Sequence, residues 1–195
     1  MAEHSNIEWT DTTWNPVTGC TKVSPGCKNC YAEKFAERFR GVPGHPYEQG
    51  LDLKLWPERM ELPLKWSGNR MIFVNSMSDL FHEKVADDYI ERVFATMERA
   101  SQHTFQVLTK RSKRLANWAN ARYARKSGGG KKEWPKNVWI GVSVESGDYI
   151  GVRCEPPTTT IPTHPVCRSR RTRPGPLDTG RLAAYYIVNR YIDNG

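Results

Sequence analysis

Three cysteines lie within eleven residues near the start of the chain, at Cys20, Cys27 and Cys30. Their spacing is C-x6-C-x2-C, and Pro25 and Gly26 turn the chain just before the second cysteine. The x2 spacing allows two thiolates to face one metal centre. Three thiolates suit a [4Fe–4S] cluster that keeps one iron open for a substrate or cofactor, because a complete protein ligand set has four. The motif therefore predicts an iron–sulfur site.

Two other interpretations of the cysteines remain open. The first is a structural zinc ion with a fourth ligand from His45, His82 or Cys154, and the second is that the thiols bind no metal. The chain starts without a basic and apolar leader and has no run of about 20 apolar residues. We therefore expect a cytoplasmic protein with reduced thiols and no membrane partner.

The composition divides the chain into two parts. All seven tryptophans lie in residues 1–150, which we expect to form the folded domain, since the chain is 38% hydrophobic overall. Residues 151–195 contain no Trp, Phe or Lys but six of the thirteen prolines. They read as an Arg/Pro-rich tail that is irregular or disordered, or that derives from a shifted reading frame. The net charge of +8 allows a nucleic-acid partner.

Hydrophobic patterning predicts alternating strands and helices in residues 1–150. A helix is expected from Asn29 to Arg40, with one apolar face that consists of Tyr31, Ala32, Phe35, Ala36 and Phe39. Later elements are expected as strands over 71–75, 104–108 and 137–144, with helices that start at Asp87 or Asp88 and at Ser112. A first strand is expected near Ile7-Glu8-Trp9, and a last helix or strand within 182–192. This order predicts a parallel sheet of about four βα units, which is half of a closed barrel.

The helix that begins at Ser112 is basic and contains Trp118 and Tyr123. Basic and aromatic residues together suit contact with nucleic acid. The alternative is that Trp118 belongs to the core, since it shares a helix face with Leu115.

Polar residues follow each predicted strand, and the carboxyl ends of parallel strands share one edge of a sheet, where ligands bind. These residues are Asn75, Ser76, Ser78, Asp79, Thr109, Lys110, Arg111, Ser143, Glu145 and Ser146. The cysteine loop follows the first expected strand and should lie on the same edge. His82 and Glu83 are a weak signal, to which we assign no catalytic role.

Four blocks of sequence carry a resemblance to a known family. They begin at Ile7-Glu8-Trp9-Thr10-Asp11 with the cysteine loop, at Phe73-Val74-Asn75-Ser76, at Phe105-Gln106-Val107-Leu108 and at Trp139-Ile140-Gly141-Val142. In this order, over about residues 5–147, the chain resembles a phage- and prophage-associated three-cysteine family, a divergent branch of the radical-SAM barrels. Two departures stand out: the usual first cysteine gap is three rather than six, and the resemblance stops near Asp148.

The resemblance implies a partial radical-SAM-type (βα) barrel, a [4Fe–4S] cluster, S-adenosylmethionine (SAM) and a three-Cys-motif partner protein. It implies an enzyme that cleaves SAM reductively to modify an unknown substrate. By position, Ser76, Ser78, Asp79, Ser143 and Glu145 would bind SAM, and Lys110 and Arg111 would bind an anionic substrate such as nucleic acid. The alternatives are a zinc-stabilised nucleic-acid-binding module and an inactive truncated fragment of a mobile-element protein. Truncation would leave an exposed strand edge after Val144.

Overall fold

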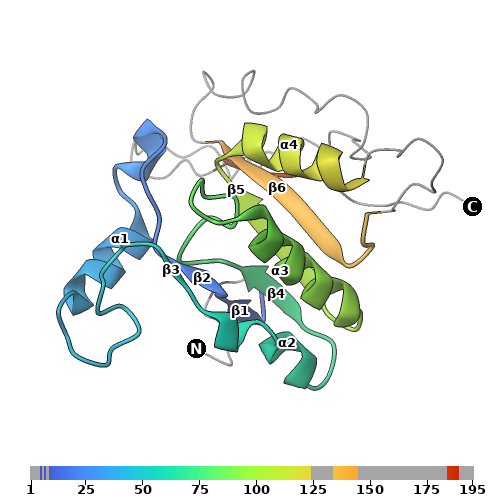
Figure 1. Ribbon diagram of the computed structural model, residues 1–195, viewed down its shortest axis with the longest axis horizontal. Coiled ribbons are helices and arrows are strands. Elements are labelled where there is room, and N and C mark those ends of the chain that lie inside the picture. The colour runs from blue at the N-terminus through green and yellow to red at the C-terminus, as the bar shows by residue number, and fades with distance from the viewer. Residues whose placement is uncertain (1–4, 6, 8, 124–133, 145–183, 189–195) are drawn as a thin grey trace, which may run out of the picture.

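The computed structural model describes residues 5, 7, 9–123, 134–144 and 184–188. Its centre is a sheet in the order β1-β4-β5-β6-β7 (Figure 1). The strands are β1 (Thr12–Trp14), β4 (Met71–Val74), β5 (Thr104–Thr109), β6 (Val138–Val144) and β7 (Ala184–Val188). The first four are parallel, and β7 is antiparallel to β6. The mixed α/β class and the parallel sheet are thus confirmed, and the described strands form an open sheet.

Two helices connect the parallel strands and pack on one face of the sheet (Figure 1). They are α3 (Asp87–Arg99) between β4 and β5, and α4 (Ser112–Tyr123) between β5 and β6. Their buried side chains share one core with alternate residues of the strands, which fits the period-2 and 3.6-residue patterns of these segments. That core includes Ile72, Val74, Phe105, Val107, Ile90, Val93, Phe94, Met97, Leu115 and Trp118. Trp118 therefore belongs to the core, and its ring is not available for stacking on nucleic acid.

The first strand lies later in the chain than the sequence predicts. β1 is Thr12–Trp14 rather than a segment near Ile7 and Trp9. The Trp14 side chain is fully buried, and its Nε1–H donates to the Arg59 carbonyl at 2.8 Å. Trp9 instead packs edge-on against the Phe73 ring, with centroids 4.8 Å apart. The deeper burial of Trp14 fixes which segment enters the sheet.

The region between β1 and β4 contains only short elements. They are β2 (Val17–Thr18), η1 (Pro25–Cys27), α1 (Tyr31–Ala36), η2 (Glu37–Phe39), β3 (Lys54–Leu55), η3 (Pro57–Arg59) and α2 (Leu62–Lys65). The predicted helix over 29–40 is therefore shorter, and its predicted apolar face is only partly buried. Ala32 and Ala36 pack against Met77, whereas 59% of Tyr31 and 44% of Phe35 are exposed.

In the C-terminal part, β7 confirms the last helix or strand expected within 182–192, inside the otherwise irregular tail predicted for 151–195. It pairs along β6 from Ile140 to Val144. The edge of β6, predicted to be exposed, is therefore covered by backbone hydrogen bonds. The rest of the tail, including 151–181, lies outside the described residues. Among the described helices, none has the length and apolar character needed to cross a membrane.

Candidate functional site

The cysteine loop is fastened to the segment that follows β4. The Asn15 Oδ1 atom accepts hydrogen bonds from the Ser76 hydroxyl at 3.2 Å and the Met77 N–H at 3.1 Å. The Ser78 hydroxyl donates to the Val17 carbonyl at 2.8 Å. The sequence-based expectation that the loops after the first two parallel strands meet at one edge of the sheet is confirmed. The two serine hydroxyls, predicted to bind a cofactor, hold these loops together.

Gly19 sets the approach of the cysteine loop to residues 51 and 52. Its φ is +83°, and a Cβ atom built there would lie 2.1 Å from the Asp52 carbonyl oxygen. The next residue, Cys20, donates its N–H to the Leu51 carbonyl at 3.0 Å. Only glycine tolerates both this backbone conformation and this close approach, so Gly19 positions the first cysteine.

Asp79 is the buried acceptor at the centre of the site, directly after β4. Its Oδ1 accepts the Thr109 hydroxyl at 2.7 Å and the Phe81 N–H at 3.0 Å, and its Oδ2 accepts the Lys110 N–H at 3.0 Å. The same Oδ2 lies 3.7 Å from the Nε atom of Arg111. The carboxylate thus joins the ends of β4 and β5 and orients the buried guanidinium.

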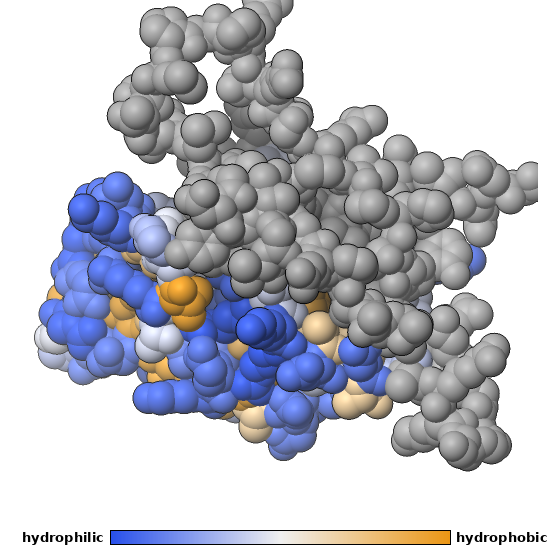
Figure 2. Space-filling model, turned by 90° about the horizontal axis from the view of Figure 1, so that it is seen from above, coloured by the Kyte–Doolittle hydropathy of each residue, from blue (hydrophilic) through white to orange (hydrophobic). Residues whose placement is uncertain are grey.

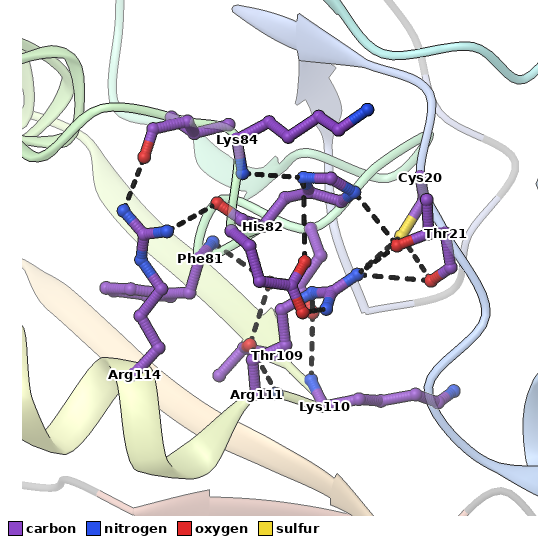
Figure 3. A network of polar contacts seen from close by, with 12 residues as sticks. Cys20, Thr21, Phe81, His82, Lys84, Thr109, Lys110, Arg111 and Arg114 are labelled. Carbon is purple, nitrogen blue, oxygen red and sulfur yellow. Dashed lines mark hydrogen bonds and ion pairs between the residues drawn. The ribbon is translucent and has the colours of Figure 1, made fainter.

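Arg111 connects this carboxylate to the cysteine loop (Figure 3). Its Nη2 group donates to the Thr21 carbonyl at 3.1 Å and the Thr21 hydroxyl at 3.0 Å, and lies 3.8 Å from the Cys20 Sγ. Its Nη1 group pairs with Glu83. Its side chain is only 5% exposed. A fixed cation therefore lies beside the first thiol.

His82 belongs to the same network, although its sequence context is only a weak signal. It is buried, and the Lys84 N–H donates to its Nδ1 at 3.1 Å. The Nε2–H must then donate to the Thr21 hydroxyl, 3.0 Å away. Burial lowers the pKa of His82, and the charge of Arg111 lowers it further. The imidazole is therefore neutral and serves as a hydrogen-bond donor.

A cleft of about 300 Å³ opens beside Cys20. Its lining combines the thiol with hydroxyl, imidazole, ammonium and carboxylate groups and two leucines, contributed by Cys20, Thr21, Leu51, Asp52, Leu53, His82 and Lys84. Figure 3 shows Cys20, Thr21 and His82 on one side of the network and the Lys110 side chain extending away from it. The cleft gives a small molecule access to the first cysteine.

The environment distinguishes the cysteine thiols. None of Cys20, Cys27 and Cys30 forms a disulfide, and all three are partly exposed. Burial raises the pKa of Cys20, and the charge of Asp79 adds to this effect. Burial also opposes ionisation of Cys27, but hydrogen bonds from its own loop and the charge of Lys110 lower its pKa overall. Cys27 is therefore more easily ionised than Cys20.

The described side chains include no group of three or more Cys, His, Asp or Glu residues at metal-binding spacing. Among the alternative zinc ligands, His45 stacks on Phe39 with ring centroids 3.8 Å apart, and its Nδ1 accepts the Tyr47 N–H. His82 is engaged as described above, and Cys154 lies outside the described residues. Within 9–123 and 134–144, neither of these histidines therefore serves as a fourth ligand beside the cysteines.

Asn75 is a residue that the sequence analysis noted only as part of the strand-end cluster. It follows β4 with φ of +57° and is 3% exposed. Neither Oδ1 nor Nδ2 of its side chain has a hydrogen-bond partner. A buried carboxamide in this state is costly unless a ligand or water meets it. Of the other predicted cofactor contacts, Ser143 is buried at the end of β6, and Glu145 lies outside the described residues.

Comparison with known proteins gives one match. The model of a family described as a protein of unknown function (DUF5131) matches residues 4–160. No curated protein and no solved structure matches the chain. The matched range runs past residue 150, where the sequence analysis placed the end of the folded domain.

Proposed function

The chain belongs to the DUF5131 family, whose description assigns no activity, and from the site itself we propose that it is a radical-SAM-like iron–sulfur enzyme. In this proposal Cys20, Cys27 and Cys30 hold a [4Fe–4S] cluster at the carboxyl edge of the parallel sheet. Lys110 supplies the positive charge that favours an anionic substrate, whereas Arg111 is already paired with Glu83 and bonded to Thr21 and positions the cysteine loop.

The observation that supports the proposal most is the placement of the thiols. Three cysteines outside any disulfide lie on one loop, and Arg111 and Lys110 act on two of them. The charge of Lys110 helps to lower the pKa of Cys27 and so favours its thiolate, the form in which cysteine binds metal. At Cys20, burial and the charge of Asp79 outweigh Arg111 and raise the pKa of the thiol. The three sulfur atoms do not form a ligand group among the described side chains, so their convergence on one cluster is itself part of the proposal.

The donor set also suits SAM. When bound, a [4Fe–4S] cluster with SAM supplies one-electron cleavage of the sulfonium carbon–sulfur bond. The amino and carboxylate groups of such a ligand need hydrogen-bond partners in a buried place. Asn75 offers both a donor and an acceptor there, whereas the hydroxyls of Ser76 and Ser78 are already engaged. We therefore assign the main polar contact of SAM to Asn75 and a supporting role to the two serines.

The remaining polar residues at the site position the cysteine loop. Asp79 fixes the Arg111 guanidinium, which in turn donates to the Thr21 carbonyl at 3.1 Å. His82 stays neutral and donates to Thr21, so that it adds no second positive charge to the thiol side of the cleft. These groups keep the loop in place while a substrate enters.

Anaerobic reconstitution of the full chain with iron and sulfide tests the proposal. The expected result is about four irons per chain, a brown chromophore and cleavage of SAM after addition of dithionite. The triple variant Cys20→Ser/Cys27→Ser/Cys30→Ser should lose the chromophore. The control Cys154→Ser/Cys167→Ser, which changes the two other cysteines, should retain it. About one zinc per chain and no chromophore would instead favour a zinc-stabilised module and refute the enzyme.

A further inference from the structure

Helix α1 and the turn that follows it expose a stripe of alternating aromatic and basic side chains. The stripe consists of Tyr31, Lys34, Phe35 and Arg38, at positions i, i+3, i+4 and i+7. These spacings place side chains on one helix face. Large apolar side chains that are exposed next to one another often mark an interaction site. Of the five exposed large hydrophobics among the described residues, four lie between 23 and 42.

The charge around the stripe is positive, although α1 contains acidic residues as well. Glu33 is paired with Lys22 at 2.8 Å, and Glu37 is paired with Arg40 at 2.6 Å. No ion pair joins Lys34 to another part of the described chain, and the same holds for Arg38. Figure 2 shows patches of apolar surface among strongly hydrophilic ones at the end of the molecule that carries α1.

We propose that this stripe binds single-stranded nucleic acid. Exposed aromatic rings stack on bases of any sequence, and cations spaced between them contact the phosphates. The stripe starts directly after Cys30, so a strand bound there would pass beside the cysteine loop. Single-stranded nucleic acid would then be the substrate class of the iron–sulfur centre, and this role rests on the proposed function. Binding itself needs no metal.

The fold also removes the other nucleic-acid surface that the sequence suggested. The basic helix α4 turns Trp118 and Tyr123 into the core, where they are 4% and 1% exposed. Rings held inside cannot stack on bases.

The two rings of α1 are held in place at one side but stay partly open to solvent. The Tyr31 hydroxyl donates to the Ser76 carbonyl, and 59% of the residue is exposed. Phe35 packs against Phe39 and Tyr47, and 44% of it is exposed. Ala32 and Ala36 anchor the helix against Met77.

Fluorescence anisotropy with a labelled oligo-dT and a labelled oligo-U, on the full chain treated with a chelator, tests the inference. Phe35→Ala should weaken binding by about tenfold. Tyr31→Ala should do the same, whereas Tyr31→Phe, which keeps the ring, should bind as the unmodified chain does. Lys34→Gln/Arg38→Gln should lower the slope of log affinity against log salt by about 0.7 per cation.

Controls separate this inference from the proposed enzyme. Lys65→Gln/Lys113→Gln removes two exposed cations elsewhere and should leave affinity within about twofold. The triple cysteine variant should bind normally, so a failed reconstitution leaves the binding result standing. Absence of binding at low salt would overturn the inference. It would also be overturned if polyglutamate competed as well as the oligonucleotide while the ring variants kept full affinity, since the surface would then suit an acidic protein.

Discussion

Asp79→Asn is the substitution whose effect the structure predicts most directly. The carboxylate accepts three hydrogen bonds and faces the Arg111 Nε at 3.7 Å, with side chains 9% and 5% exposed. Asparagine keeps one acceptor, but its amide group places a second donor against the Lys110 N–H or the guanidinium. Breaking a buried pair on one side typically costs about 3–5 kcal/mol. We expect about 3 kcal/mol, because Arg111 retains Glu83 and Thr21 as partners.

Urea unfolding followed by tryptophan fluorescence measures this loss. With a slope of about 2–3 kcal/mol per molar urea, the midpoint should fall by about 1–1.5 M. The matched control is Asp87→Asn, because Asp87 pairs with Arg114 at 2.8 Å but is 72% exposed. Such a surface pair contributes about 0.5 kcal/mol, so its midpoint should move by only about 0.2 M.

A double-mutant cycle decides whether loss of the ion pair with Arg111 causes the destabilisation of Asp79→Asn. Asp79→Asn combined with Arg111→Met should be less destabilising than the sum of the single variants by about 1–2 kcal/mol. Equal midpoint shifts for Asp79→Asn and Asp87→Asn, or strict additivity in the cycle, would refute the reasoning that Asp79 holds a buried cation in place.

Two further predictions concern the backbone and the pH dependence of stability. Gly19→Ala should lower the free energy of unfolding by about 2–4 kcal/mol, because the added Cβ would overlap the backbone of residues 51 and 52. The control is Gly41→Ala in the same urea assay. Gly41 has φ of +79° but open space around it, so this variant should lose only about 1 kcal/mol. His103 is buried, and its Nδ1 accepts the Arg70 N–H at 3.3 Å. Burial lowers its pKa below the usual 6.5, so the unfolded chain binds a proton more readily than the folded chain does. The free energy of unfolding should therefore fall as the pH drops below about 6.5. Thermal melts between pH 7.5 and 5 should show a weaker pH dependence for His103→Gln, and an unchanged slope would contradict this assignment.

Local sequence patterns were sufficient to predict the central elements of the fold. β4, β5 and β6 are apolar runs bounded by polar residues, and α3 repeats its apolar residues at helical spacing, so local pattern and tertiary burial agree. The rule that ligand sites lie beyond the ends of parallel strands also placed Asp79, Lys110 and Arg111 near Cys20. These features were predictable because each depends on residues close together in the chain or on a general property of parallel sheets.

The role of each polar residue at the site depends on long-range contacts. Arg111 contacts Thr21 across 90 residues of sequence, and Ser78 contacts Val17 across 61. Such pairings depend on how loops from different strands meet, which no local pattern records. The same holds for Tyr31 and Phe35, which the helical pattern assigned to the core. In the tertiary structure Ala32 and Ala36 are the buried residues of α1, packed against Met77. Tyr31 reaches the Ser76 carbonyl with its hydroxyl and Phe35 packs against Phe39 and Tyr47, so both rings stay partly exposed.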